Sequence, residues 1–209
     1  MKVLKSLNSE DHSLIIGECS RMLSEKGAVL LLPTETVYGF MCRWDDQQAR
    51  DKIFQMKKRD SNKPFQMLAS SIAQAEKEGL VFEGEAKLIA EKFFPGAMTL
   101  VVKSRTGGTT GLRIPDHYLT LKLIEKINSP LAATSANISG EPAALTLEDA
   151  LKNLEILPDI ALDGGAIESG AASTVVDATS TPFKVIRHGP IREEEIRKVT
   201  NNSSHFHAN

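Results

Sequence analysis

Apolar and polar residues alternate along the chain in blocks that predict helices and strands in turn. The first helix is predicted from Ser9, as its N-cap, to about residue 26, because apolar residues recur on one face and Gly27 follows as a stop. Residues 28–32 form a continuous apolar run, which is typical of a buried strand. A turn-rich segment, residues 33–39, follows this strand.

The same alternation continues to the end of the chain. Further helices are predicted at residues 46–58, 71–78, 85–94, 117–127, 146–154 (with Thr146 as cap) and 191–199. Further strands are predicted at residues 40–43, 65–69, 97–103, 111–114, 131–134, 160–162, 174–177 and 184–187. Because the order lacks strict βαβ regularity, we expect an α/β fold in which one mixed sheet is covered by helices.

The composition agrees with one domain. The chain has 209 residues, of which 41% are hydrophobic and 25% charged, so it can bury a substantial core. We assign residues 1–200 to this domain and residues 201–209, which are polar and patternless, to a disordered tail. No apolar run is long enough to span a membrane, and the N-terminus lacks the apolar stretch of a secretory signal.

Cysteine usage and net charge narrow the function. Cys19 and Cys42 are too few for a disulfide framework or a zinc cluster, so we expect buried free thiols and a cytoplasmic location. The net charge of −2 excludes a global basic field for nucleic acids but leaves room for a local basic cleft. The sequence has no dinucleotide-binding glycine motif, no P-loop and no nucleophile elbow, and its histidines lack metal-ligand spacing.

Four polar segments interrupt apolar strands, and strand ends are where ligands bind in many α/β proteins. They are residues 33–39 (PTETVYG), 57–63 (KKRDSNK), 133–140 (ATSANISG), and the pair 173–177 and 185–189. Lysine and arginine can bind phosphate or carboxylate, and small hydroxyl and amide groups can hydrogen-bond phosphate or ribose. Taken singly, each segment is also compatible with a capped turn, a solvated basic face or a plain strand end.

Together these segments resemble the YrdC-like family of L-threonylcarbamoyladenylate synthases. The match rests on PTETVYG at 33–39, KxR at Lys57 and Arg59, FPGAMTLVV at 94–102, GLRIPDH at 111–117, SxN at Ser135 and Asn137, STVVDAT at 173–179 and VIRHGPI at 185–191. The order holds from about residue 10 to residue 198. The chain resembles the short, single-domain form, because longer relatives carry a second, C-terminal domain.

The resemblance implies a twisted mixed sheet with surrounding helices and a large basic concave cleft. It implies that L-threonine, bicarbonate and ATP give threonylcarbamoyl-AMP and pyrophosphate, for threonylcarbamoylation of adenosine 37 in tRNAs that read ANN codons. A separate tRNA threonylcarbamoyl transferase complex performs that second step. Mg²⁺ would accompany ATP without a dedicated protein site.

The resemblance also assigns roles to individual residues. The catalytic tetrad would be Lys57, Arg59, Ser135 and Asn137. The residues that contact ATP would be Arg59, Lys63, Ser135 and Arg187, although relatives have either lysine or asparagine at the position of Lys63. The residues that contact threonine would be Thr34, Arg113 and Ser173.

Other functions remain open at this point. The same basic cleft could bind double-stranded RNA or tRNA, in which case binding would weaken steeply with salt and ignore threonine. A related domain of hydrogenase maturation proteins processes carbamoyl phosphate, but it normally lies within a larger chain that has zinc fingers. A divergent paralogue could also act on another substrate, against which the intact SAN segment argues.

Overall fold

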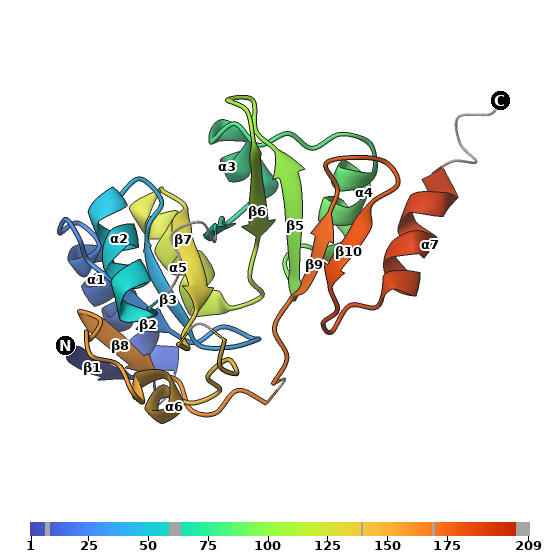
Figure 1. The fold of residues 1–209 in the computed structure, drawn as a ribbon. Helices are drawn as coiled ribbons and strands as arrows, with labels where there is room; N and C mark the ends of the chain where they lie inside the picture. Colours follow the sequence, from blue (N-terminus) through green and yellow to red (C-terminus); the bar gives the residue numbers. More distant parts are fainter. Residues whose placement is uncertain (7–8, 59–63, 139, 169, 204–209) are drawn as a thin grey trace.

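Ten strands form a single mixed sheet in the computed structural model, which describes residues 1–6, 9–58, 64–138, 140–168 and 170–203 (Figure 1). In sheet order the strands are β1 (Lys2–Lys5), β8 (Ile160–Asp163), β2 (Leu30–Leu32), β3 (Gly39–Arg43), β7 (Leu131–Ser135), β4 (Gln66–Leu68), β6 (Thr109–Arg113), β5 (Met98–Lys103), β9 (Thr174–Asp177) and β10 (Lys184–Arg187). Four neighbouring pairs are parallel and five are antiparallel. The prediction of a mixed sheet is therefore confirmed.

Helices pack on both faces of this sheet. They are the 3₁₀ helix η1 (Ser9–Asp11) and the α-helices α1 (His12–Met22), α2 (Gln47–Met56), α3 (Ile72–Lys77), α4 (Gly84–Phe93), α5 (Tyr118–Ile127), α6 (Leu147–Leu151) and α7 (Glu193–Ser203). Each α-helix overlaps a predicted one. The predicted cap is confirmed at Thr146, whose Oγ1 accepts a hydrogen bond of 3.1 Å from the amide of Asp149.

Three details of the prediction were wrong. Strand β1 was not expected, because its four residues, KVLK, show neither a continuous apolar run nor a regular alternation and lie at the edge of the sheet. Asp11, in place of Ser9, occupies the N-cap position of α1, and the 3₁₀ turn that begins at residue 9 precedes it. The last helix was expected to stop near residue 199 and to give way to a tail, whereas α7 continues to Ser203. The rest of the predicted tail lies outside the described residues.

Apolar side chains divide the core into two halves along the sheet. In the half built on β2, β3, β7 and β8, helices α1 and α5 pack on one face, and α2 and α6 pack on the other. In the half built on β4, β5, β6 and β9, helices α3, α4 and α7 contribute to one core cluster on a single face. The other face of these four strands carries the small and polar side chains of the site described below.

Both cysteines are buried free thiols, as the sequence predicts. Burial raises the pKa of each thiol, Cys19 and Cys42, to about 12, because a low-polarity environment disfavours the thiolate. Among the described helices, none has the length and apolar character that crossing a membrane requires.

Candidate active site

A cavity of about 540 Å³ lies over the face of β4, β5, β6 and β9 that is opposite the helices α3, α4 and α7. Its floor is made by alternate residues of these strands, because successive side chains of a strand point to opposite faces. Those that face the cavity are Gln66, Thr99, Val101, Thr109, Gly111, Arg113 and Val175. Their sequence neighbours Met67, Leu100, Leu112 and Val176 face the core instead.

The side chain of Lys57 lies in the wall of this cavity with only 2% of its surface exposed. Its ammonium group donates to the carbonyl oxygens of Ser135 and Asn137, the latter at 2.6 Å, and lies 3.3 Å from Asn137 Oδ1. A buried ammonium group requires such acceptors to offset its lost hydration. Lys57 therefore ties the end of α2 to the loop that follows β7.

The loop after β7 is held in one conformation by its own side chains. Ser135 Oγ donates to Asn137 Oδ1 over 2.5 Å. Asn137 Nδ2 donates to the carbonyl oxygens of Ile138 and Glu141 at 3.0 and 2.7 Å. These bonds fix the loop that lines the cavity before any ligand arrives, and they occupy the hydroxyl hydrogen of Ser135 and both hydrogens of the Asn137 amide.

Arg113 is buried at the end of β6, with 3% of its surface exposed. Its Nη2 lies 2.8 Å from Oε1 of Glu35, and its Nε donates to the carbonyl oxygen of Gly96 at 3.3 Å. Glu35 Oε1 also accepts from the amide of Asp116 at 3.1 Å. The guanidinium is therefore fixed on one side by a carboxylate while Arg113 lines the cavity.

Arg187 reaches the same cavity from the edge strand β10. Its Nε and Nη2 donate to the carbonyl oxygen of Ser173 at 3.1 and 2.9 Å, and Nη2 also donates to Ser173 Oγ at 3.2 Å. Partial desolvation of the guanidinium, together with the nearby charge of Arg113, lowers the pKa of Arg187, whose residue surface as a whole is exposed. Two mutually repelling cations at one cavity favour an anionic ligand between them.

A bulge in β10 turns Arg187 toward the cavity. Val185 pairs with Val176, and Arg187 pairs with Val175, so the register shifts at Ile186. In a regular strand Val185 and Arg187 would share a face. The extra residue instead leaves Val185 packed against the core and places Arg187 with Val175 in the lining of the cavity.

The two threonines of the PTETVYG segment face different cavities. Thr36 lines the cavity with Arg113 and Ser173, whereas Thr34 does not. Thr34 Oγ1 donates to the carbonyl oxygen of Val37 at 2.8 Å and accepts from the amides of Thr36 and Val37, so the turn itself uses its hydroxyl. Thr34 thus does not line the cavity that holds the other residues predicted to contact threonine, although its Oγ1 lies 3.0 Å from Oγ1 of Thr36, which does.

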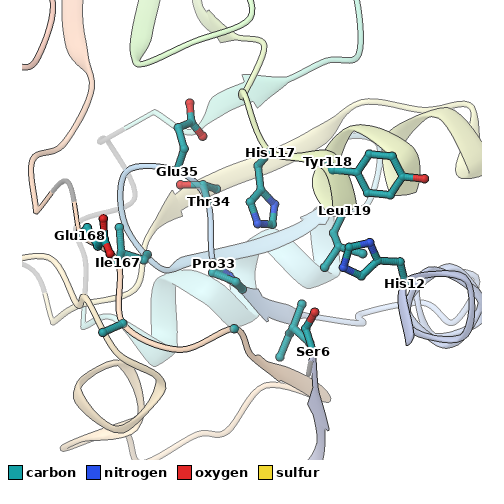
Figure 2. A pocket seen from close by; sticks show the side chains of 13 residues that line it. Ser6, His12, Pro33, Thr34, Glu35, His117, Tyr118, Leu119, Ile167 and Glu168 are labelled. Atoms are coloured by element: carbon teal, nitrogen blue, oxygen red, sulfur yellow. The ribbon is translucent and has the colours of Figure 1, made fainter. Parts of the chain in front are cut away.

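Thr34 and Glu35 instead line a second cavity of about 650 Å³, beside the ends of β1 and β8. Figure 2 shows His117 within it, with His12 and Ser6 on one side and Glu168 on another. The carboxylate of Glu35 lies at the edge remote from Ser6 and His12. Glu35 therefore stands in the wall between the two cavities, because its partner Arg113 lines the first one.

Of the residues predicted for the site, the structure brings six together in the first cavity: Lys57, Arg113, Ser135, Asn137, Ser173 and Arg187. Arg59 and Lys63 lie outside the described residues, so the expected basic character of the cleft stays a prediction. Sequence reasoning missed Thr36, Gln66 and Thr99, although the first and last of these stand in quoted motifs. Across the described ranges, no group of three or more His, Cys, Asp or Glu side chains is arranged to hold a metal ion.

Comparisons with known proteins identify the family of this chain. A family model for Sua5, YciO and YrdC, described as telomere recombination, matches residues 22–189. A threonylcarbamoyl-AMP synthase of Pyrococcus abyssi is 37% identical over 183 residues, which cover 83% of this chain and 54% of that relative. One from Bacillus subtilis is 33% identical over 194 residues, covering 88% of this chain and 56% of the relative. This chain thus spans little more than half the length of these two relatives.

A solved structure supports the same relationship. The crystal structure of Pyrococcus abyssi Sua5 complexed with L-threonine has a TM-score of 0.82 to this chain at 33% identity, and the match covers 95% of this chain and 60% of that one. The fold, the family model and the identity to these relatives agree. The chain belongs to the Sua5/YciO/YrdC family.

Proposed function

We propose that this chain is an L-threonylcarbamoyladenylate synthase, which converts L-threonine, bicarbonate and ATP into threonylcarbamoyl-AMP, pyrophosphate and water. The observation that carries the proposal is the meeting of Arg113, Arg187, Ser173, Ser135 and Asn137 in one cavity. Two cations and several hydroxyl and amide groups suit a triphosphate beside an amino acid. The names of the relatives and the threonine-bound Sua5 structure add support.

Threonine would bind by matching charges and hydrogen-bonding groups. Arg113 can take the carboxylate, because Glu35 already holds the other part of its guanidinium. Thr36 and Ser173 can take the ammonium and hydroxyl groups, which are hydrogen-bond donors. We assign this role to Thr36 in place of Thr34, because only Thr36 lines the cavity with Arg113.

ATP would lie against the loop after β7 and against β10. Ser135 and Asn137 lie at the place proposed for the α-phosphate and would exchange their bonds within the loop for bonds to it. Arg187 can bind a phosphate oxygen, with Arg59 and Lys63 completing the cationic set. Lys57 acts as a positioning residue, because its ammonium group holds the carbonyl oxygens of Ser135 and Asn137. Mg²⁺ enters only as the counter-ion of the ATP phosphates.

The chemistry needs no protein nucleophile. The threonine amine, after losing a proton, adds carbon dioxide formed from bicarbonate and becomes a carbamate. A carbamate oxygen then attacks the α-phosphorus, and the bond to the bridging oxygen of pyrophosphate breaks. Alignment of the two substrates and neutralisation of charge are the contributions that the residues of this cavity can make. Transfer of the product to tRNA by a separate transferase complex is part of the same proposal.

Mass spectrometry of the nucleotide products tests this proposal. Incubation with ATP, Mg²⁺, bicarbonate and L-threonine should give threonylcarbamoyl-AMP and pyrophosphate. Carbon-13 bicarbonate should increase the mass of the product by that of one neutron. Formation of ADP alone, or a product that does not depend on threonine, would contradict the synthase. The RNA-binding alternative gains no support from the names of the relatives described above.

A further inference from the structure

A chain of hydrogen bonds crosses the floor of the cavity from β4 to the segment before β9. Thr99 Oγ1 donates to Gln66 Oε1 at 2.9 Å, and Thr99 Oγ1 lies 2.8 Å from Ser173 Oγ. Thr99 and Ser173 are 6% and 3% exposed, and all three residues line the cavity. The chain thus connects a residue with no assigned role, Gln66, to a proposed threonine ligand.

The number of hydrogens fixes the direction of this chain. A hydroxyl carries one hydrogen, and Thr99 uses its hydrogen on Gln66. Ser173 must therefore donate its own hydrogen to Thr99. Ser173 Oγ also accepts from Arg187 Nη2 at 3.2 Å. Its remaining capacity is one lone pair, so Ser173 can only accept a hydrogen bond from a ligand.

From this geometry we infer that Gln66 and Thr99 are positioning residues that make Ser173 an acceptor for the ammonium group of the amino-acid substrate. The inference rests on the proposed function. The substrate ammonium group can only donate, whereas the substrate hydroxyl can donate or accept. A serine that presented its hydrogen to the cavity would face the ammonium group donor to donor. Fixing the direction of the chain removes that arrangement before the substrate binds.

Two pairs of variants separate this role from simple packing. Thr99→Val removes the hydroxyl and keeps the shape, whereas Thr99→Ser keeps the hydroxyl. Gln66→Met removes the acceptor at the start of the chain, whereas Gln66→Glu keeps it. We expect Thr99→Val and Gln66→Met to raise the dissociation constant for L-threonine about tenfold, which corresponds to one hydrogen bond. Thr99→Ser and Gln66→Glu should stay within about twofold of the original protein.

A double-mutant cycle distinguishes positioning of Ser173 from a purely structural role of Thr99 and Gln66. If Thr99 and Gln66 act through Ser173, their effects on threonine binding should disappear in a Ser173→Ala background. Calorimetric titration of L-threonine into each variant measures the dissociation constant in both backgrounds. The inference would be overturned if threonine affinity fell equally with and without Ser173, or if Thr99→Val lost no affinity. Threonine binding by the wild-type chain would in that case leave the proposed function standing. Absence of threonine binding to the wild-type chain would overturn the proposed function and the inference together.

Discussion

Glu35 and Arg113 form an ion pair between two cavities, with 2.8 Å separating Glu35 Oε1 from Arg113 Nη2. Glu35 lines the cavity shown in Figure 2, and Arg113 lines the proposed substrate cavity. The amide of Asp116 holds the same carboxylate oxygen, while Glu35 Oε2 is buried without a hydrogen-bond partner in the described structure. The carboxylate is thus committed to one cation and fixes its direction.

Glu35→Gln should therefore weaken threonine binding without a comparable effect on ATP. The variant keeps the size of the side chain but removes the charge that aims Arg113. We expect the KM for threonine to rise about tenfold with kcat nearly unchanged, as for a lost ground-state interaction. The unfolding free energy should fall by about 2 kcal/mol, because the buried guanidinium of Arg113 would lose its opposite charge.

A matched control is Glu125→Gln, which removes the carboxylate partner of Lys122 on the exposed surface of α5. Exposed ion pairs contribute little to stability, so this variant should behave as the wild-type chain. Steady-state kinetics with each substrate varied in turn, and urea unfolding, measure both effects. An unchanged KM for threonine in Glu35→Gln would show that Arg113 does not need its carboxylate partner.

Lys57→Met should disrupt the loop after β7. The methionine has a similar length but cannot donate to the carbonyl oxygens of Ser135 and Asn137. Leaving buried acceptors unsatisfied costs about 1–3 kcal/mol, so we expect a loss of unfolding free energy in this range. Because Ser135 and Asn137 would lose their fixed orientation, kcat should fall as well.

The neighbouring residue provides the control for Lys57. The side chain of Lys58 is 59% exposed and pairs with Glu155 on the surface. Lys58→Met should therefore leave kcat nearly unchanged and should change the unfolding free energy by no more than a few tenths of a kcal/mol. Denaturant unfolding and pyrophosphate release, measured side by side, distinguish the two lysines. Equal behaviour of both variants would mean that the buried ammonium group does not hold the loop.

The sequence predicted the buried elements better than the contacts between them. Residues 28–32 and 131–134 were identified as strands because their apolar runs are continuous, and β2 and β7 lie there. The edge strand β1 has no such run, and its partner β8 is far away in the sequence. Pairing between distant segments leaves no local pattern, so the order of the strands could not be read from one sequence.

Local sequence patterns also predict the residues of the site better than the direction of their side chains. The polar segments at strand ends pointed to Arg113, Ser135 and Ser173, and the structure brings these three into one cavity, while their roles stay predictions. The choice between Thr34 and Thr36 depends on which hydroxyl the turn uses for itself, and that is decided by backbone geometry. The face of Arg187 depends on a bulge, which a pattern of alternating residues does not reveal.

The two thiols should not react in the folded protein. Burial raises the pKa of Cys19 and of Cys42 from 9.0 to about 12, so folding keeps both thiols protonated. The stability that follows from this is fully present below pH 9.0 and is lost as the pH rises toward 12. At pH 8 we expect a thiol reagent to modify the native chain at least about a hundredfold more slowly than the urea-unfolded chain.

An exposed cysteine serves as the reference for reagent access. Lys198 is exposed on α7, so Lys198→Cys should add one thiol that reacts rapidly in the native state. Absorbance of the released reagent group measures both rates. Rapid reaction of two thiols in the native wild-type chain would contradict the burial of Cys19 and Cys42.

Gly189 should tolerate no side chain, because its Cα faces the backbone that carries Ser173. A Cβ at this position would lie 2.4 Å from the amide nitrogen of Thr174, 2.5 Å from the carbonyl oxygen of Ala172 and 2.7 Å from the carbonyl carbon of Ser173. Backbone atoms cannot turn away as a flexible side chain can. Gly189→Ala should therefore displace Ser173 and Arg187 together, with a loss of at least about 2 kcal/mol of unfolding free energy from overpacking.

The matched control is Gly17→Ala in α1, where a Cβ would meet nothing within 4 Å. Alanine has a higher helix propensity than glycine, so this variant should gain about 0.5–1 kcal/mol. We expect Gly189→Ala to lose threonine binding at a temperature where it is still folded, and Gly17→Ala to bind as the wild-type chain does. Calorimetric titration with L-threonine, combined with thermal unfolding, tests both expectations. If Gly189→Ala bound L-threonine as tightly as the wild-type chain, recognition of the amino acid would not depend on the fixed position of the segment around Ser173.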